Sequence, residues 1–492
     1  MNGRTNTTSV TEVVEGVQVA LEAPTNLVLT PLNARVDLTW TDPVDKYAAP
    51  DGQTATNPWD NVATWDHSIV VRKAGSAPTS PDDGELIYTE TTRNQHQYTA
   101  YSDTDNVINN TVYYYAIYAI TTMDAISDPI IDSCKPIEGT PEFDKLIGTL
   151  NGNYRSANPG AIGDYALFAG GDYGNPTTSY TGAVDTFNIS LTQGSATSLP
   201  NQTDTSITST ARTDYVLFCG GAISRYSSSV TATNTVIAYD TSLTQSTATQ
   251  LSSNAKFVGA ATLNNVSFVA GGSSATGNQR NAVEVYDESL TKSSAQNMPS
   301  ALYKVSGDKI GTHVVFGGGL HNQYYSYVSH MTTYSQVIAY DQSRTLSSLT
   351  SLSVPRNTCG CAALDNCIVF AGGSYNGEGG YTEGIHCEVD AYDTSLTKLP
   401  DVTSLPGGNV AVFTTYPNSA VRCGSYIVVK YGTGMSDDGF VQYDSSLTQS
   451  RVKNTENIPS DVLTTSRFTS IGDYALIPGY GRSTQVIAIK AV

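Results

Sequence analysis

The sequence predicts an all-β chain in two parts, a small sandwich followed by a larger array of similar sheets. Glycine (42) and tyrosine (31) are abundant and only 14% of residues are charged, a composition typical of short strands joined by polar turns. Strand-like runs follow one another closely before residue 135, and a set of short phrases recurs from about residue 160 onward. A chain of 492 residues also exceeds the usual size of one domain, so at least two are expected.

Seven strand-like runs separated by turn residues occupy the first part of the chain. They cover residues 26–30, 35–41, 68–73, 85–90, 95–98, 111–121 and 126–131. This number of short strands predicts a sandwich of two sheets. In the second run Val36, Leu38 and Trp40 alternate with polar residues, which places one face of that strand in the core and the other in water.

Three features of residues 23–135 resemble a fibronectin type III domain. They are the leading Ala23-Pro24, the sequence LTW at 38–40 and the aromatic run TVYYYAIYA at 111–119. The resemblance implies that one tyrosine between Tyr113 and Tyr115 faces the core and that its hydroxyl reaches the backbone at a corner of the sandwich. An insertion at about 46–62 departs from the family pattern.

Acidic residues in and near that insertion leave two interpretations open. Their carboxylates offer the oxygen ligands that calcium requires, but a solvated loop without metal is the favoured interpretation, so no cofactor is predicted. The acidic residues are Asp42, Asp45, Asp51 and Asp60. Residues 1–22 precede the sandwich and are predicted to form an arm that orders only against a neighbouring subunit.

A repeat dominates the second part of the chain. An apolar strand ending in a glycine pair recurs as YALFAGG, YVLFCGG, VSFVAGG, VVFGGG and IVFAGG, with the degenerate copies IVVKYG and YALIPGY, and it ends at 171, 221, 272, 319, 373, 432 and 480. Each copy is followed by a second phrase such as VIAYD, and most then have a turn SLT or SRT. Repeats of about 50 residues indicate a β-propeller, because a single four-stranded sheet cannot bury both of its faces.

The glycine pair and the later Tyr-Asp resemble the kelch repeat, which implies a seven-bladed propeller over residues 143–492. The chain departs from the family in that its three tryptophans, Trp40, Trp59 and Trp65, all lie in the first part. The seventh copy ends one strand short, so residues 145–150 are predicted to supply the missing outer strand. Residues 136–142 would then link the two domains. The repeated Tyr-Asp and SLT are predicted to fix turns through side-chain to backbone hydrogen bonds.

The charge balance and the cysteines narrow the possible functions. A formal net charge of −19 disfavours nucleic acid and anionic membrane surfaces as partners. The seven cysteines follow no disulfide or strong zinc pattern, so buried reduced thiols are favoured over a metal site at Cys359, Cys361 and Cys367 or His386. We expect neither a signal peptide nor a membrane-spanning segment.

Candidate binding residues lie between each glycine pair and the next strand, where length and content vary most. No catalytic motif is found. Tyrosines among small polar residues are typical of adaptable recognition surfaces, although packing against an adjacent blade is an equal alternative. The longest such loop is 320–336. The candidates are His321, Tyr324, Tyr325, Tyr327, His330, Tyr334, Tyr173, Tyr180, Arg225, Tyr226, Arg280, Tyr375 and Tyr381.

A fibronectin-like module joined to a kelch-like propeller, without an export signal, resembles a bacteriophage virion protein of the tail, baseplate or capsid surface. The segment VRKAGSAPTSPDDGELIY is similar to modules of such proteins. The resemblance implies a multicopy, non-enzymatic protein of the virion that is anchored through residues 1–135 to other virion proteins and binds a host glycan or protein through the propeller. The alternatives are a carbohydrate-active or copper-dependent kelch enzyme, since imidazole is the favoured copper ligand, and an intracellular scaffold.

Overall fold

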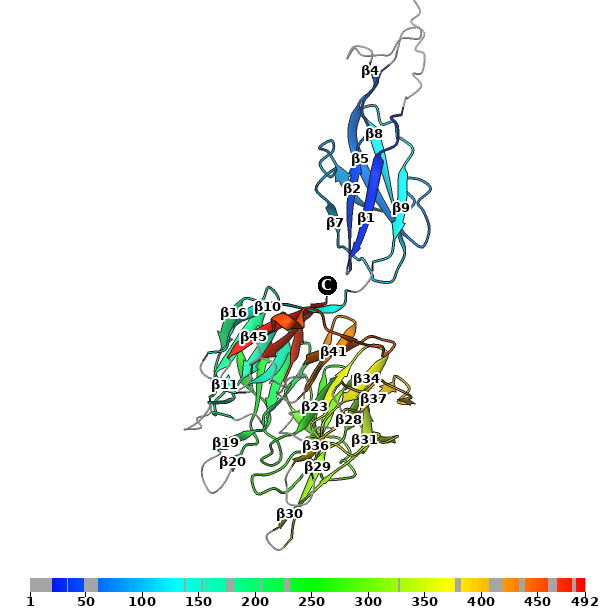
Figure 1. Ribbon diagram of the computed structural model, residues 1–492. Coiled ribbons are helices and arrows are strands. Elements are labelled where there is room, and N and C mark those ends of the chain that lie inside the picture. Colours follow the sequence, from blue (N-terminus) through cyan, green and yellow to red (C-terminus); the bar gives the residue numbers. More distant parts are fainter. Residues whose placement is uncertain are drawn as a thin grey trace, which may run out of the picture. The chain divides into compact units, whose positions relative to one another are not determined.

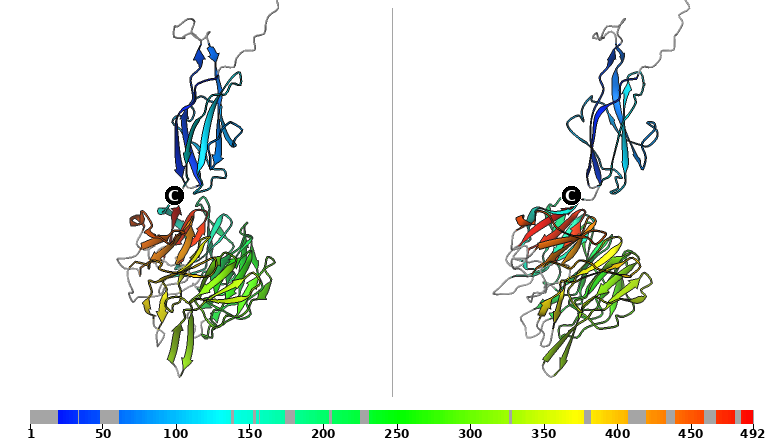
Figure 2. Two further views of the ribbon diagram at one scale, coloured as in Figure 1. Left: turned by 90° about the vertical axis from the view of Figure 1, so that its right-hand side faces the viewer. Right: turned by 45° about the vertical axis from the view of Figure 1, so that its right-hand side comes forward.

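The computed structural model divides the chain into two compact units, Met1–Gly139 and Thr140–Val492. It describes residues 20–32, 34–47, 61–136, 139–151, 154–155, 157–173, 181–203, 206–224, 231–325, 328–376, 382–406, 419–432, 439–458, 467–479 and 484–491. The regular structure in these ranges is almost entirely antiparallel strand (Figures 1 and 2). The predicted all-β class is therefore confirmed.

The first unit contains a three-stranded and a four-stranded sheet. The smaller sheet has the order β1 (Thr25–Leu32), β2 (Arg35–Thr41), β7 (Tyr101–Asp103), and the larger has the order β6 (Glu85–Glu90), β5 (Trp65–Ala74), β8 (Tyr113–Thr121), β9 (Ile130–Cys134). Between β2 and β5 in the sequence, β3 (Lys46–Tyr47) and β4 (Asn61–Ala63) form a separate two-stranded sheet. Apolar side chains of both sheets form one shared cluster.

Two predictions about the core of the first unit are confirmed. Val36, Leu38 and Trp40 are buried while the residues between them are partly exposed. Tyr113 is buried, and its hydroxyl donates to the carbonyl of Asn106 at 3.3 Å and accepts from the backbone N–H of Ile108 at 3.0 Å. A buried phenol needs such partners because an unpaired hydroxyl is costly in an apolar core.

Two of the predicted strands are displaced. Residues 95–98 form turns, and the strand begins only at Tyr101. A reciprocal pair explains the turn: the backbone N–H of Asp42 donates to Asn94 Oδ1 at 2.8 Å, and the N–H of Asn94 donates to Asp42 Oδ2 at 2.7 Å. Asn94 has a φ of 61°, which asparagine tolerates better than most residues. The last strand is Ile130–Cys134 rather than 126–131.

Two of the four acidic residues considered as calcium ligands already have hydrogen-bond or ion-pair partners within the protein. The Asp42 carboxylate accepts from Trp40 Nε1 at 3.0 Å and from the Ser68 hydroxyl at 2.6 Å. The Asp45 carboxylate accepts from the backbone N–H of Trp65 at 3.0 Å and pairs with Arg93. Asp51 and Asp60 lie outside the described residues. These bonds fasten the strands around the insertion without a metal.

The predicted N-terminal arm is too long at its C-terminal end. Leu21 is 4% exposed and packs with Ala63, Trp65 and Ala119 in the first unit. An apolar side chain buried in this way belongs to the sandwich rather than to a free arm. Residues 1–19 lie outside the described part of the chain.

The second unit contains seven four-stranded antiparallel sheets among its described residues. In chain order their strands are β12 (Asn158–Ile162), β13 (Tyr165–Ala169), β15 (Val184–Asn188), β16 (Gln193–Ala196); β17 (Thr208–Ala211), β18 (Tyr215–Cys219), β21 (Val236–Asp240), β22 (Gln245–Thr247); β23 (Gly259–Leu263), β24 (Val266–Ala270), β25 (Val283–Tyr286), β26 (Lys292–Ser294); β27 (Ser306–Ile310), β28 (His313–Gly317), β31 (Val337–Asp341), β32 (Leu346–Leu349); β33 (Gly360–Ala363), β34 (Cys367–Ala371), β37 (Val389–Asp393), β38 (Lys398–Leu399); β39 (Ala420–Cys423), β40 (Tyr426–Tyr431), β41 (Gly439–Tyr443), β42 (Gln449–Arg451); and β43 (Thr469–Ile471), β44 (Tyr474–Pro478), β45 (Gln485–Ala491), β10 (Pro141–Thr149).

The first strands of these sheets, here called the inner strands, contact one another in cyclic order. β12 contacts β17, and the contacts continue through β23, β27, β33, β39 and β43 back to β12. Apolar clusters fill the spaces between successive sheets. Each sheet therefore buries its faces against its neighbours, as the repeat predicts.

The last sheet takes its outer strand from the start of the second unit. β10 pairs with β45, with Pro141 opposite Ala491 and Thr149 opposite Gln485 (Figure 1). The prediction that residues 145–150 supply the missing outer strand is thus confirmed, but the observed strand is longer and begins at Pro141. The predicted linker 136–142 therefore extends too far, because its last two residues belong to β10. Pro141 is buried and the next two residues, Glu142 and Phe143, are half-buried, and a strand that begins with proline and glutamate has no apolar alternation to reveal it.

The repeated Asp-x-Ser-Leu-Thr closes the turn between the third and fourth strands. Asp240 Oδ1 accepts from the backbone N–H of Ser242 at 2.9 Å and of Thr244 at 2.8 Å, while Leu243 has a φ of 61°. The same bonds recur at Asp287, Asp393 and Asp444. The predicted structural role of this phrase is confirmed, because the carboxylate holds the turn against the strain at leucine.

The tyrosine of the second phrase joins neighbouring sheets. The buried hydroxyls of Tyr239, Tyr392 and Tyr443 donate to the backbone carbonyls of Thr197, Thr350 and Thr403 beyond the outer strand of the preceding sheet, at 2.6, 2.7 and 2.8 Å. At the equivalent Tyr340 the hydroxyl is buried without a hydrogen-bond partner among the described residues.

This difference predicts unequal effects of one substitution. We expect Tyr392→Phe to lower the free energy of unfolding by about 1 kcal/mol, because it removes the hydrogen bond from its hydroxyl to the carbonyl of Thr350. Tyr340→Phe removes a hydroxyl that has no such partner and is expected to be neutral or stabilising. Urea titration of both variants measures the difference, and equal losses would contradict the proposed inter-sheet bond.

Candidate functional site

The glycine pairs mark one end of each sheet in the second unit. At Gly271 the φ is 65°, and an added Cβ would lie 2.2 Å from the carbonyl oxygen of Leu302. At Gly318 the distance to the carbonyl oxygen of Arg356 would be 2.3 Å. Glycine is therefore required because the segment leading into the next sheet crosses directly over the strand end.

The segments beyond the five glycine pairs are mostly paired strands, although the segment after Gly272 forms turns. Four of them form two-stranded ribbons, which corrects the expectation of loops. The ribbons are β11 (Tyr154–Arg155) with β14 (Asp172–Tyr173), β19 (Ala222–Ser224) with β20 (Thr231–Ala232), β29 (Leu320–Tyr325) with β30 (Val328–Thr333), and β35 (Ser374–Asn376) with β36 (Thr382–Ile385). In each ribbon one strand comes directly after the second strand of a four-stranded sheet. All four ribbons therefore lie at the same end of the sheets, here called the ribbon end (Figures 1 and 2).

The ribbon end holds two aromatic pairs, one between two predicted residues and one between a predicted residue and His386. The rings of His321 and Tyr334 are 6.5 Å apart, and His321 Nδ1 lies 2.9 Å from the carbonyl oxygen of Ala301. The ring of Tyr375 lies 5.0 Å from that of His386. β30 also contacts β35, so these ribbons form a continuous surface.

The remaining predicted residues are placed differently. Arg280 Nη2 is 2.6 Å from Glu284 Oε2 and Nη1 is 3.1 Å from the carbonyl oxygen of Ser253, so this guanidinium is engaged within its own sheet and its neighbour. His330 lies on β30. Tyr173, Tyr324 and Tyr325 lie on ribbon strands, with only the backbone described, and Tyr180, Arg225, Tyr226, Tyr327 and Tyr381 lie outside the described residues.

The cysteines are reduced in the structure. Cys359 and Cys361 are buried in one apolar cluster and Cys367 in another, as predicted for core thiols. Burial raises the pKa of each of these thiols, which disfavours the thiolate that metal binding needs. Within the described ranges, no group of three His, Cys, Asp or Glu side chains is placed to hold a metal ion. The same residues include no helix long and apolar enough to cross a membrane.

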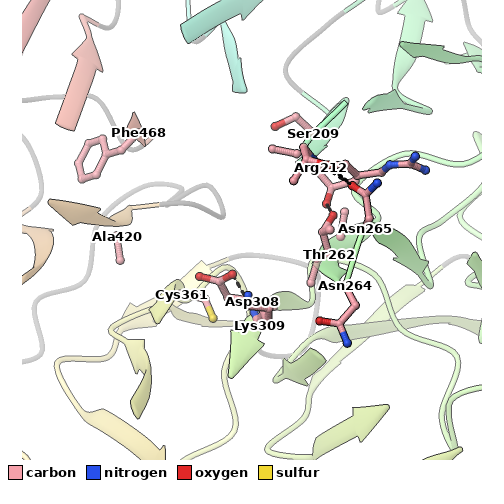
Figure 3. A pocket seen from close by; sticks show the side chains of 16 residues that line it. Ser209, Arg212, Thr262, Asn264, Asn265, Asp308, Lys309, Cys361, Ala420 and Phe468 are labelled. Carbon is pink, nitrogen blue, oxygen red and sulfur yellow. Dashed lines mark hydrogen bonds between the residues drawn. The ribbon is translucent and has the colours of Figure 1, made fainter. Parts of the chain in front are cut away.

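Sequence reasoning missed a cavity of about 520 Å³ among the inner strands (Figure 3). It extends along the inner strands, from Ala420 and Phe468 at their start to the turn at Asn264 and Asn265. Ser209, Thr262, Asn265, Asp308 and Lys309 are among the polar residues that line it. The signal was the polar content of the inner strands and the turns after them, but the lining residues come from six different sheets.

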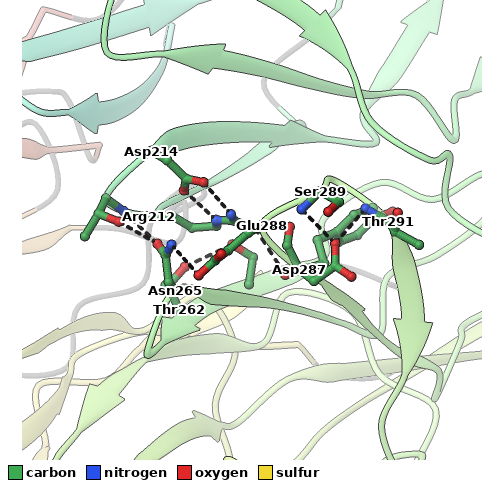
Figure 4. Close-up of polar contacts among 11 residues, drawn as sticks. Arg212, Asp214, Thr262, Asn265, Asp287, Glu288, Ser289 and Thr291 are labelled. Atoms are coloured by element: carbon green, nitrogen blue, oxygen red, sulfur yellow. Dashed lines mark hydrogen bonds and ion pairs between the residues drawn. The ribbon is translucent and has the colours of Figure 1, made fainter.

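Arg212 stabilises one wall of this cavity. Its Nε lies 3.0 Å from Asp214 Oδ1 and its Nη2 lies 2.8 Å from Asp214 Oδ2, while Nη1 donates to the carbonyl of Asp287 in the next sheet (Figure 4). Asn265 Oδ1 accepts from the backbone N–H and the hydroxyl of Thr213 at 3.0 and 2.8 Å. These bonds hold adjacent sheets in register.

Asp308 is a lining residue of this cavity whose pKa is raised. Burial raises its pKa to about 6, although the backbone N–H groups of Lys309 and Ala363 donate to its oxygens at 2.7 and 3.0 Å. A carboxyl with a folded pKa above its unfolded value costs stability above that pKa and recovers it as the pH falls.

We therefore expect Asp308→Asn to be more stable than the native protein by about 1–2 kcal/mol at pH 7. The gain should vanish below about pH 4, where the native carboxyl is protonated in both states. Asp365→Asn is the control: its carboxylate is 89% exposed and pairs with Arg422, so removal should cost at most about 1 kcal/mol. Thermal melting from pH 4 to 8 measures both variants, and a pH-independent difference at Asp308 would contradict this account.

Comparisons with known proteins do not show a family for this chain. No family model matches the chain, and no curated protein matches it. Among solved structures, one titled "Structure of YjhT" matches with 12% sequence identity and a TM-score of 0.42, covering 59% of this chain and 94% of that chain.

Proposed function

We propose that this chain is a non-enzymatic binding protein of a bacteriophage virion that attaches to a glycan or protein on the host surface. In this proposal the first unit is a fibronectin type III-like module that binds other virion proteins. The second unit is a seven-bladed, kelch-like β-propeller that presents its ribbon end to the host. If many copies were present on one particle, multivalent binding would give high avidity even though each copy binds with modest affinity.

One observation carries the proposal: the ribbons and the chain entry occupy opposite ends of the sheets in the second unit. The ribbons follow the second strands, whereas β10 begins opposite the last residues of β45, at the end of the third strands. A unit anchored through its N-terminal connection therefore leaves the ribbon end free for a ligand. The tyrosine, histidine and small polar residues there suit glycan or protein recognition.

The architecture of both units supports the two resemblances. In the first unit the three- and four-stranded sheets share a core, and a buried tyrosine fastens a corner. In the second unit seven similar sheets share faces in cyclic order, with the last sheet completed by β10. Such rigid scaffolds hold variable segments in fixed positions, which suits binding.

The proposal is tested by mass spectrometry of purified particles and by competition with the full-length chain for host attachment. We expect the chain in the particle, and we expect added protein to slow adsorption. A double variant, His321→Ala with Tyr375→Ala, should compete less well, whereas Asn264→Ala, at the opposite end of the sheets, should compete normally. Absence from particles, or sugar turnover dependent on bound copper, would contradict the proposal.

A further inference from the structure

Four equivalent residues from successive sheets are joined by backbone hydrogen bonds just before the inner strands, at the ribbon end. They are Ser206, Phe257, Lys304 and Thr358. The backbone N–H of Phe257 donates to the carbonyl of Ser206 at 2.9 Å, that of Lys304 to Phe257 at 2.9 Å, and that of Thr358 to Lys304 at 3.2 Å. Each of these residues stands two positions before its inner strand. These residues therefore border the central axis of the sheets on the side of the proposed ligand.

Three of these four positions have a strained left-handed backbone; one of them is Thr358, with a φ of 54°, and the other two hold bulky side chains. Phe257 has a φ of 54° and Lys304 a φ of 57°. Left-handed backbone favours glycine or asparagine, and a larger residue costs on the order of 1 kcal/mol or more. The backbone bonds between sheets do not need these side chains, so their presence indicates a role of the side chains themselves.

The side chains form a compact cationic and aromatic cluster. Lys304 Nζ lies 5.4 Å and Lys256 Nζ 5.9 Å from the centre of the Phe257 ring. Tyr303 is buried, and its ring lies 6.3 Å from that of Phe257, so it supports this ring from within. Unlike Tyr303, the other three residues of the cluster are half-buried; they are Lys256, Phe257 and Lys304.

The charge of Lys304 is not neutralised by a carboxylate ion pair within the described residues. Burial, with the nearby positive charge of Lys256, lowers the pKa of Lys304 to about 8. An ammonium that is partly desolvated and close to a second cation gains most when an anion approaches. In a chain with a formal net charge of −19, Lys304 is therefore a cation that an anionic ligand can approach.

We propose that Lys256, Phe257 and Lys304 bind a sugar that carries an anionic group, a carboxylate or a phosphate ester, on the host surface. The ammonium groups bind the anion and the Phe257 ring packs against the apolar face of the sugar ring. The proposal rests on the proposed function of host attachment and names the class of ligand.

The test uses the full-length protein and polysaccharide extracted from the host envelope. We expect Lys304→Gln to lower affinity for this polysaccharide at least tenfold, while Lys309→Gln, at the opposite end of the sheets, binds normally. Carbodiimide reduction of carboxylates or hydrofluoric acid removal of phosphate esters should abolish binding by the native protein and shows which anion is bound. Melting curves of both variants exclude a loss of folding as the cause.

A second measurement separates binding from a structural role. Affinity of the native protein should fall as the pH rises through about 8, because Lys304 loses its proton beside Lys256. Lys304→Arg should restore binding and keep it at higher pH, since guanidinium stays charged.

Each remaining outcome decides the proposal. Normal binding by Lys304→Gln, or binding unaffected by removal of both kinds of anion, overturns it. If the protein binds host cells but not the polysaccharide, the ligand class is wrong and the proposed function stands. If the protein does not bind host cells at all, the proposed function itself fails.

Discussion

Ile147→Asp is expected to destabilise the second unit by more than about 3 kcal/mol, because it places a charge in the sheet that joins the two ends of this unit. Ile147 lies on β10 and packs against the apolar cluster between the first and last sheets. Without β10, the edge of β45 would be left unpaired and both adjacent interfaces would lose contacts. Loss of this strand should therefore weaken all seven sheets together.

Leu146→Asp is the matched control on the neighbouring residue. Leu146 is 45% exposed, so a carboxylate there remains in water and should change stability by about 0.5 kcal/mol or less. Urea titration and limited proteolysis of the full-length chain compare the two variants. Equal stability of both would show that β10 does not close the array.

Arg356→Met is expected to have the second large effect, a loss of about 3–5 kcal/mol. Arg356 is fully buried, and its Nη2 lies 2.6 Å from Asp390 Oδ2 and 3.1 Å from the carbonyl oxygen of Phe370. Removal of the guanidinium leaves the buried Asp390 carboxylate with Lys398, 2.7 Å away, as its remaining cationic partner. A buried charge that loses a partner is costly.

A double-mutant cycle tests this explanation. Arg356→Met combined with Asp390→Asn removes both charges and should recover a large part of the loss. Arg422→Gln, which breaks an exposed pair with Asp365, should cost about 1 kcal/mol or less. Additive losses in the double variant would show that packing, rather than charge pairing, determines the effect of Arg356.

The strand pattern of the second unit could be predicted because local sequence determines it. Apolar runs such as YALFA and CIVFA became β13 and β34 with their predicted neighbours, and the Asp-x-Ser-Leu-Thr turns are closed by bonds within five residues. The ribbons could not be predicted in the same way. Their strands are largely polar and form two-stranded ribbons rather than joining a four-stranded sheet, so an apolar alternation does not identify them.

The cavity and the Phe257 cluster could not be predicted because their residues converge only in the folded array. Asp308 and Asn265 are ordinary turn residues in sequence, and nothing local indicates that they face a common space. Phe257 and Lys304 occupy one repeat position with Ser206 and Thr358. An alignment of the internal repeats would have shown two bulky residues where small ones also occur, and that contrast was the available signal.

The pairing of β10 with β45 also affects how the protein folds during synthesis. β10 leaves the ribosome before any of the seven sheets is complete, and its partner is among the last strands made. Until then β10 and the exposed side of the first sheet lack their partners, and such edges favour aggregation or association with a second nascent chain. The polar and charged residues along β10, including Asp144 and Lys145, would reduce aggregation until β45 has been synthesised.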